Sequence, residues 1–282
     1  MITLSLNLNT ARSMLPKRDP YGHKGTFGKV LLLCGSRGYT GAAYFAAMGA
    51  LRSGAGLVFL GVPRCIYDIE AAKLNEPVIF PLPEEKGVLS SSAIPLILKW
   101  LTQVDTVLLG CGLGLTEGAE AVAEAVISQA ECPLILDADG ITLAARHKDI
   151  LRRRTAPTIL TPHDGEFRRL GGVLGKDRMA AAAEMSRDLN SIVLLKGHRT
   201  CITDGYARYC NETGNSGMAV GGSGDLLSGI LAGLLGQGMD PLEATACAAF
   251  FHGAAGDAAA AELGEYGMLP SDMLNFLPRL LR

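Results

Sequence analysis

Short apolar runs alternate along the chain with longer segments in which small and apolar residues recur at helical spacing. A short apolar run bounded by turn residues is typical of a buried strand, and a longer segment of helical period is typical of a helix. The predicted strands are 30–35, 57–62, 104–110, 134–137, 158–161 and 192–196. The predicted helices are 38–53, 118–129, 179–189, 225–235 and 241–263.

This alternation predicts an α/β fold in three layers, with helices covering both faces of a central, mostly parallel sheet. Late in the chain, the runs 200–203 and 207–210 flank Asp204-Gly205, which is a strong signal for an antiparallel hairpin. No polar linker or internal repeat divides the sequence, so we expect a single domain over residues 1–282.

The composition narrows the classes of function. Of the 282 residues, 48% are hydrophobic and 19% are charged, which argues against an intrinsically disordered chain. The net charge of −2 argues against binding to nucleic acid. The amino terminus is unlike a signal peptide and no apolar run reaches about 18 residues, so we expect no membrane association. Seven cysteines without a Cys-x-x-Cys pair are typical of reduced thiols and predict a cytoplasmic protein.

Glycines and polar residues gather directly after the predicted strands. In an open parallel sheet the carboxyl ends of the strands lie along one edge, and ligands bind there. We therefore expect these turns to converge on one site. They are 35–43, 110–114, 137–140, 161–166 and 196–200.

The segment 221–225, Gly-Gly-Ser-Gly-Asp, opens a predicted helix. Glycines at a helix start let backbone N–H groups surround an anion, and the helix dipole adds to the attraction. We predict an anion hole made by Gly222, Ser223 and Gly224, with Asp225 at its edge as the base for an attacking hydroxyl. The alternative is that Asp225 is only an N-cap. The flanking glycines favour phosphoryl transfer, although the segment is neither a Walker loop nor a dinucleotide fingerprint.

Other side chains at these turns have two interpretations each. Lys196 reaches an anionic phosphate from its strand end, or it belongs to a solvated loop. His163 and Glu166 contact ligands, or they are a surface turn residue and a helix-start carboxylate favoured by the dipole. Asn215 contacts substrate, or it is a turn residue.

Two further strand ends carry small or acidic residues. The turns 41–43 and 112–114 let a bulky dinucleotide approach the backbone, or they serve only close packing of helix on strand. Asp137 and Asp139 orient substrate or magnesium, while a helix N-cap is an equally good interpretation of Asp139.

In their order along the chain, these turns resemble those of the ADP- or ATP-dependent NAD(P)H-hydrate dehydratases of the ribokinase-like superfamily. The resemblance spans residues 24–225 and continues in the tail at 254–257. One departure is Cys111, where the family usually has proline. The matching motifs are Lys24-Gly25-Thr26-Phe27-Gly28, Gly35-Ser36-Arg37-Gly38-Tyr39-Thr40-Gly41-Ala42-Ala43, Gly110-Cys111-Gly112-Leu113-Gly114, Asp137-Ala138-Asp139-Gly140, Thr161-Pro162-His163-Asp164-Gly165-Glu166, Lys196-Gly197-His198 and 214–225.

The resemblance implies a repair reaction on hydrated NADH or NADPH, in the S configuration. This damaged cofactor carries a hydroxyl on its reduced nicotinamide ring, and hydroxide is a poor leaving group. Phosphorylation of the hydroxyl makes phosphate the leaving group, and elimination restores the dihydropyridine. Asp225 would deprotonate the hydroxyl while the anion hole holds the transferring phosphoryl group. ADP is the expected donor, with ATP as the alternative, and Mg²⁺ is the expected cofactor.

The resemblance also assigns roles to individual residues. It implies a homotetramer, and a separate NAD(P)H-hydrate epimerase, because the epimerase domain often fused to this family is not recognisable in residues 1–282. Glu166 would hold magnesium through water. The implied substrate contacts are Ala43, Gly114, His163, Asn215 and Asp225. The implied nucleotide contacts are Lys196, Gly197, His198, Arg199, Thr200 and Gly224.

Two alternatives stand beside this interpretation. An ordinary ribokinase-like kinase of a vitamin-precursor alcohol would use the same anion hole and the same Asp225. His163 in place of asparagine and the glycine-rich turn 110–114 favour the dehydratase. A nucleotide-binding regulatory protein without catalysis is the second alternative, and the intact Gly-Ser-Gly-Asp argues against it.

Overall fold

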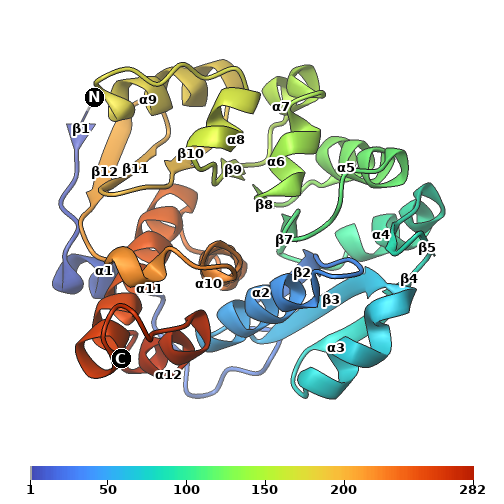
Figure 1. The fold of residues 1–282 in the computed structure, drawn as a ribbon, viewed down its shortest axis with the longest axis horizontal. Helices are drawn as coiled ribbons and strands as arrows, with labels where there is room; N and C mark the ends of the chain where they lie inside the picture. Colours follow the sequence, from blue (N-terminus) through green and yellow to red (C-terminus); the bar gives the residue numbers. More distant parts are fainter. Residues whose placement is uncertain (1) are drawn as a thin grey trace.

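The computed structural model describes residues 2–282 and contains a central sheet of ten strands (Figure 1). Their order across the sheet is β1-β12-β11-β10-β9-β8-β7-β2-β3-β4. The strands are β1 (Ile2–Thr3), β2 (Lys29–Leu33), β3 (Leu57–Pro63), β4 (Val78–Leu82), β7 (Thr106–Leu109), β8 (Leu134–Leu136), β9 (Thr158–Leu160), β10 (Ile192–Leu195), β11 (Thr200–Thr203) and β12 (Ala207–Asn211). A separate two-stranded sheet pairs β5 (Glu84–Glu85) with β6 (Val88–Leu89).

Neighbouring strands of the large sheet are parallel except where β11 pairs with β10 and with β12. These antiparallel pairs contain the predicted hairpin, in which Thr200 lies opposite Asn211. The amino-terminal β1 pairs with β12, so Ile2 lies opposite Ala207. The predicted mostly parallel sheet with a late antiparallel hairpin is therefore confirmed.

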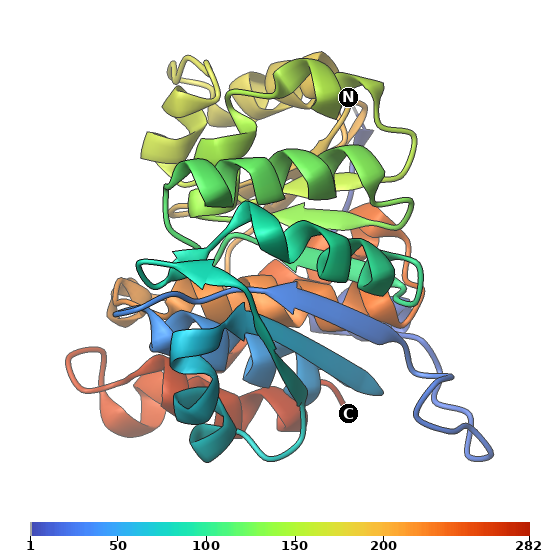
Figure 2. The ribbon, with the colours of Figure 1, turned by 90° about the vertical axis from the view of Figure 1, so that its right-hand side faces the viewer.

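Side chains alternate along each buried strand, so both faces of the sheet are apolar, and helices cover both. In β2, Val30 and Leu32 enter one hydrophobic core, while Leu31 and Leu33 enter the other. The first core packs under α1 (Leu8–Met14), α2 (Thr40–Arg52), α3 (Tyr67–Lys73), α10 (Ser223–Gly236), α11 (Pro241–Leu263) and α12 (Pro270–Leu280). The second core packs under α4 (Ile94–Leu101), α5 (Glu117–Gln129), α6 (Asp139–Ala144), α7 (Lys148–Arg153), α8 (Asp164–Arg169) and α9 (Arg178–Leu189). Helix α5 lies in front of the strands in Figure 2.

The direction of the strand order reverses between β2 and β7. From β2 the chain adds β3 and β4 on one side, and from β7 it adds β8, β9 and β10 on the other. The turns that follow β2 and β7 meet at this switch point: Gly35 N donates to Cys111 O at 2.8 Å, and Ser36 Oγ donates to Gly112 O at 2.8 Å. Ligands of open parallel sheets bind beyond the strand ends at such a point.

Close packing against α2 fixes the position of α10. A Cβ atom on Gly229 would lie 2.2 Å from Ala46 O, and one on Gly49 would lie 2.6 Å from Leu226 O. Only glycine allows the two helix backbones to approach so closely. The amino terminus of α10, which carries the predicted anion hole, is therefore held against the sheet.

The apolar pattern did not predict several elements of the structure, which are β1, β4, α1, α3, α4, α6, α7, α8 and α12. The predicted elements have shifted ends. The strand expected from residue 104 begins at Thr106, and the helix expected from Asp225 begins at Ser223. None of the helices in residues 2–282 combines the length and apolar character that a bilayer crossing requires.

Candidate active site

The amino terminus of α10 has the geometry of an anion-binding helix start. Gly222 is its N-cap, with a left-handed backbone (φ +94°), and a Cβ atom there would lie 2.7 Å from Phe45 Cδ2. A side chain at this position would therefore strain the backbone and clash with a ring. Asp225 is the third residue of the helix, so the alternative that it is the N-cap is wrong.

Two donors in this first turn are free. In residues 2–282, no protein acceptor takes the backbone N–H of Gly224 or of Asp225, whereas Ser223 N donates to Val220 O at 3.3 Å. A helix start with unpaired N–H groups attracts negative charge, because the helix dipole acts in the same direction. Of the predicted anion hole, Gly224 keeps a free N–H, whereas the N–H of Ser223 is already paired within the turn. Asp225 supplies the second free donor.

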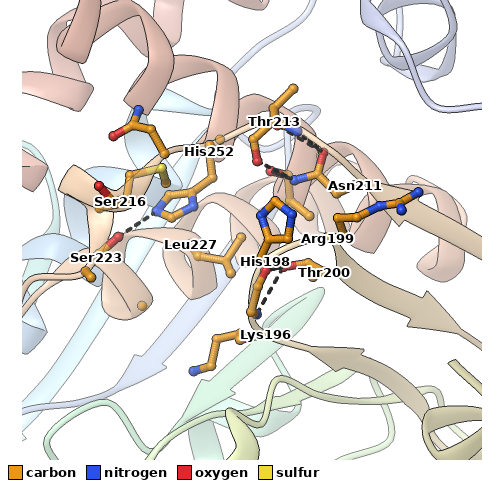
Figure 3. Close-up of a pocket in the computed structure, with 18 of the residues that line it drawn as sticks. Lys196, His198, Arg199, Thr200, Asn211, Thr213, Ser216, Ser223, Leu227 and His252 are labelled. Carbon is orange, nitrogen blue, oxygen red and sulfur yellow. Dashed lines mark hydrogen bonds between the residues drawn. The ribbon is translucent and has the colours of Figure 1, made fainter. Parts of the chain in front are cut away.

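A pocket of about 810 Å³ opens directly over this helix start (Figure 3). Its wall brings together every predicted nucleotide contact: Lys196, Gly197, His198, Arg199, Thr200 and Gly224. Apolar and small residues that the sequence did not single out, including Leu227, Ala249 and Gly253, complete the wall. A pocket with a largely apolar wall and an anion-binding end suits a nucleotide.

Helix α11 holds the loop that leads to the anion hole. Asp257 accepts hydrogen bonds from Gly214 N at 2.9 Å and from Asn215 Nδ2 at 3.0 Å. Asn215 Oδ1 accepts from Gly217 N at 3.0 Å. Asn215 lines the pocket, yet one donor and one acceptor of its amide already stabilise this turn. Its structural interpretation is supported, and its contact with substrate stays a prediction.

His252 is a further residue of the pocket wall. Its Nε2 lies 3.3 Å from Ser223 Oγ, at the first residue of α10. Burial lowers the pKa of His252 to about 4, so the imidazole is neutral near pH 7. Its spacing of 29 residues from Ser223 carries no sequence signal for this contact.

Asp225 lies beside the pocket in a cluster of ionisable groups. The ligand atoms of Cys111, Asp137 and Asp225 are all within 4.8 Å of one another. Burial, followed by the charge of Asp137, raises the pKa of Asp225 to about 6. A carboxylate with this pKa is ionised at neutral pH and takes up a proton more readily than an ordinary aspartate.

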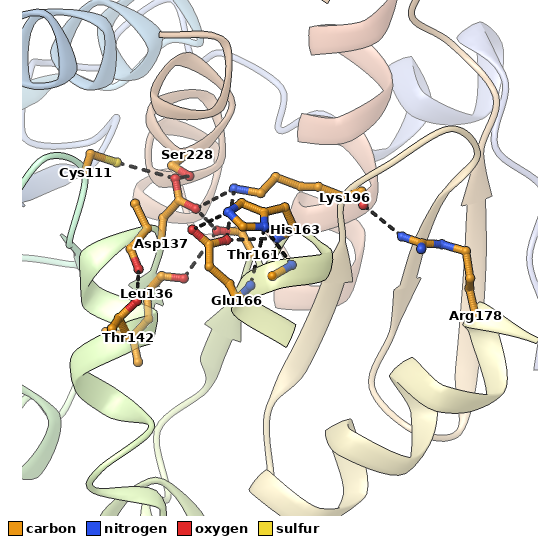
Figure 4. A network of polar contacts seen from close by, with 12 residues as sticks. Cys111, Leu136, Asp137, Thr142, Thr161, His163, Glu166, Arg178, Lys196 and Ser228 are labelled. Carbon is orange, nitrogen blue, oxygen red and sulfur yellow. Dashed lines mark hydrogen bonds and ion pairs between the residues drawn. The ribbon is translucent and has the colours of Figure 1, made fainter. Parts of the chain in front are cut away.

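Asp137 is the centre of a buried polar network (Figure 4). Its Oδ1 accepts hydrogen bonds from Lys196 Nζ at 2.7 Å and from Thr161 Oγ1 at 2.8 Å. Its Oδ2 accepts from Ser228 Oγ at 2.8 Å and from Cys111 Sγ at 3.6 Å. Burial alone raises the pKa of Asp137, but the Lys196 ammonium and these hydrogen bonds outweigh it and lower the pKa.

Lys196 extends from the end of β10 towards these carboxylates. Its Nζ lies 3.8 Å from Glu166 Oε2 in addition to its bond with Asp137. Burial lowers the pKa of Lys196, and the charges of Asp137 and Glu166 raise it further than burial lowers it. The solvated-loop interpretation of Lys196 is wrong, because its ammonium is held by two buried carboxylates.

His163 and Glu166 form a capping box at the start of α8. Gly165 N donates to His163 Nδ1 at 2.9 Å, and His163 N donates to Glu166 Oε2 at 2.9 Å. Glu166 is 5% exposed, and its other oxygen lies 3.3 Å from His163 Nε2. A carboxylate so engaged does not fit a direct magnesium ligand, and the contact through water stays a prediction.

The remaining predicted residues lie at the switch point. Gly114 has φ +90° and donates its N–H to Asp139 Oδ2 at 2.8 Å, so Asp139 holds this turn and is not an N-cap. Ala43 is fully buried in α2. Neither Ala43 nor Gly114 lines the 810 Å³ pocket, and their contacts with substrate stay predictions.

Comparison with known proteins identifies the family of the chain. A sequence model of the family described as NAD(P)H-hydrate dehydratase matches residues 30–279. The chain belongs to this family. It is 43% identical over 278 residues to the bifunctional NAD(P)H-hydrate repair enzyme Nnr of Moorella thermoacetica, with 96% of this chain and 52% of the relative covered. The chain thus spans about half the length of that bifunctional relative.

Other dehydratase family members match over nearly their whole length. The ADP-dependent (S)-NAD(P)H-hydrate dehydratase of Bacillus subtilis is 35% identical over 283 residues, which cover 95% of this chain and 94% of the relative. A crystal structure of the Bacillus subtilis ADP/ATP-dependent NAD(P)H-hydrate dehydratase, co-crystallised with ATP and Mg²⁺, has a TM-score of 0.82 at 32% identity and covers 97% of this chain and 96% of that one. A ribokinase-like protein of Enterococcus faecalis gives 0.86 at 30% identity, covering 99% and 95%. The ribokinase-like fold is confirmed.

Proposed function

We propose that this chain is an ADP-dependent dehydratase that restores NADH and NADPH from their S-configured hydrates, with ATP as an alternative donor. The observation that carries the proposal is the position of Asp225, with a pKa raised to about 6, in the first turn of a helix that offers free N–H groups to a pocket. Family membership and the match to an ADP-dependent relative support the substrate class.

In the proposed reaction, Asp225 takes the proton of the hydrate hydroxyl. The oxygen of that hydroxyl attacks the terminal phosphorus of the donor. The bond from that phosphorus to the bridging oxygen breaks, leaving AMP from ADP, or ADP from ATP. The N–H groups of Gly224 and Asp225 face the charge that the transferring phosphoryl group carries. The ring carbon–oxygen bond then breaks, an adjacent ring carbon loses a proton, and NAD(P)H and phosphate are released.

We further propose that Mg²⁺ accompanies the nucleotide, since phosphate oxygens are the ligands that it prefers. Bound there, it would neutralise part of the phosphate charge. A cytoplasmic location is supported by the seven free cysteines of residues 2–282. A homotetramer and cooperation with an NAD(P)H-hydrate epimerase follow from the resemblance. The bifunctional name of the Moorella relative is compatible with that cooperation.

The test is the recovery of NADH absorbance from the NADH hydrate, with ADP and with ATP in parallel. We expect stoichiometric NADH and phosphate, faster with ADP. Nucleotide consumption that leaves a stable phosphorylated product from a vitamin-precursor alcohol, without any NADH, would favour the kinase alternative instead.

The base assignment has its own test. Asp225→Asn removes the proton acceptor but keeps the size of the side chain, so we expect kcat to fall by about 10²–10⁴-fold. The free N–H groups of the anion hole remain, so nucleotide binding, measured by calorimetry, should stay close to wild type. Unchanged turnover in this variant would refute the base assignment.

A further inference from the structure

We propose that Asp137 is a positioning residue for the reaction: it fixes the Lys196 ammonium beneath the anion hole and sets the charge environment in which Asp225 takes up its proton. This inference rests on the proposed function, because it assigns Asp225 the role of base. Asp137 does not line the 810 Å³ pocket, and it acts through its neighbours.

The contacts of Asp137 are with protein groups at the centre of the site. The carboxylate is 1% exposed, and each oxygen accepts two hydrogen bonds. Three of these donors, Thr161, Lys196 and Ser228, lie within 2.8 Å of the carboxylate. Its partners come from three strand ends and from α10, so one carboxylate joins the elements that build the site (Figure 4). They are Cys111, Thr161, Lys196 and Ser228.

Ser228 links this network to the base through α10. Ser228 follows Asp225 by three positions, and residues at this spacing lie on the same face of a helix. Its hydroxyl donates to Asp137 Oδ2 at 2.8 Å. The turn of helix that carries Asp225 is therefore tied directly to Asp137.

Lys196 reaches the anion hole because Asp137 holds it there. A Cβ atom on Gly224 would lie 3.6 Å from Lys196 Nζ, so the ammonium is directly below the first turn of α10. Without Asp137 the nearest carboxylate on Lys196 would be Glu166, at 3.8 Å. The ammonium would then be free to turn towards Asp225, and the base would be weakened by ion pairing.

Besides burial, four groups in the described chain influence the pKa of Asp225. Asp137 and Asp139 bear the same charge as Asp225 and raise its pKa, whereas the Cys111 hydrogen bond and the Lys196 ammonium lower it. Of these four groups, Asp137 has the largest effect on the pKa of Asp225, and this effect is larger than the opposite effect of Lys196. Removal of Asp137, alone or together with Lys196, should therefore lower the proton affinity of Asp225.

The experiment measures this affinity without turnover. Protein labelled with ¹³C at the aspartate carboxyl carbons is titrated by NMR, and the resonance missing from Asp225→Asn is assigned to Asp225. In the wild type its midpoint is expected at about pH 6. In Asp137→Asn we expect a midpoint lower by about one pH unit. The double variant Asp137→Asn/Lys196→Met leaves no unpaired buried ammonium. Its Asp225 midpoint should also fall, but by less than in Asp137→Asn.

The matched control is Ser228→Ala, which removes a hydrogen bond to Asp137 but leaves its charge. Its midpoint should stay within a few tenths of a pH unit of wild type. A midpoint at the wild-type position in both Asp137 variants overturns the inference, and so does an equal shift in Ser228→Ala. If the wild type does not restore NADH but the midpoints move as expected, the proposed function fails and the electrostatic inference stands.

Turnover provides the second readout when the wild type is active. At pH 5 a base with a pKa of about 6 is ionised in about one molecule in ten. At pH 5, Asp137→Asn should therefore keep a larger fraction of its own high-pH rate than wild type keeps. The high-pH rate of Asp137→Asn should itself be lower than that of wild type, because the base is weaker. Phosphate release is the assay, since NADH is unstable in acid. An acid limb at the wild-type position would contradict the inference.

Discussion

The contact between α2 and α10 is where the fold most directly fixes the site, and Gly229→Ala tests it. The added methyl group would lie 2.2 Å from Ala46 O, a backbone atom that cannot rotate away. Alanine gains about 0.5–1 kcal/mol over glycine in a helix interior. Overpacking at a backbone contact costs about 3 kcal/mol. We expect a net loss of about 2 kcal/mol, or a Tm lower by about 4–8 °C.

The control is Gly41→Ala on the partner helix. Nothing lies within 4 Å of a Cβ atom at Gly41, so alanine there should stabilise the protein slightly. Thermal unfolding followed by circular dichroism measures both variants. The reasoning is refuted if Gly229→Ala is as stable as wild type. Because α10 must shift away from α2 to accept the methyl group, we also expect kcat to fall in Gly229→Ala, since the anion hole moves with the helix.

Two further predictions concern buried charge. The guanidinium of Arg154 donates to Ile127 O at 2.7 Å and to Ala130 O at 2.8 Å. Arg154→Met leaves these carbonyl groups without a donor, so we expect its unfolding free energy, measured in urea, to fall by about 2–4 kcal/mol. An unchanged midpoint of urea unfolding would contradict this prediction. The raised pKa of Asp225 means that its ionisation opposes folding as pH rises from about 4 to 6. At pH 7 the unfolding free energy of Asp225→Asn, measured in urea, should therefore exceed that of wild type by up to about 3 kcal/mol. The difference should disappear below about pH 4, and equal stability at pH 7 would contradict the reasoning.

The apolar pattern predicted the central strands and the long helices because those elements are buried and long enough to show a period. It missed α6, α7 and α8, which have six residues each and complete fewer than two turns. It also missed β4, an edge strand that contains Pro81. A proline interrupts the strand signal, and an edge strand tolerates it because one side of its backbone needs no partner.

The candidate site was predictable to the extent that its residues follow strands. The turn rule predicted Lys196, and the glycine-rich helix start predicted Gly224 and Asp225; the structure brings Lys196 and Gly224 into one pocket wall, with Asp225 beside it. The partners of these groups were not predictable, because Lys196 and Asp137 are 59 positions apart and no spacing rule pairs them. The role of α11 was missed for the same reason.

The two helices at the site therefore have different tasks. Helix α10 supplies the free N–H groups and the base, and its position is set by backbone contact with α2, which leaves no room for side-chain adjustment. Helix α11 supplies acceptors, from Asp257 and from the carbonyl groups of Ala249 and Phe250, that hold the approach loop. The loop also packs closely on α11, because a Cβ atom on Gly253 would lie 2.2 Å from Thr213 Oγ1. Hydrogen bonds and close packing together therefore hold this loop, whereas close packing alone sets the position of α10.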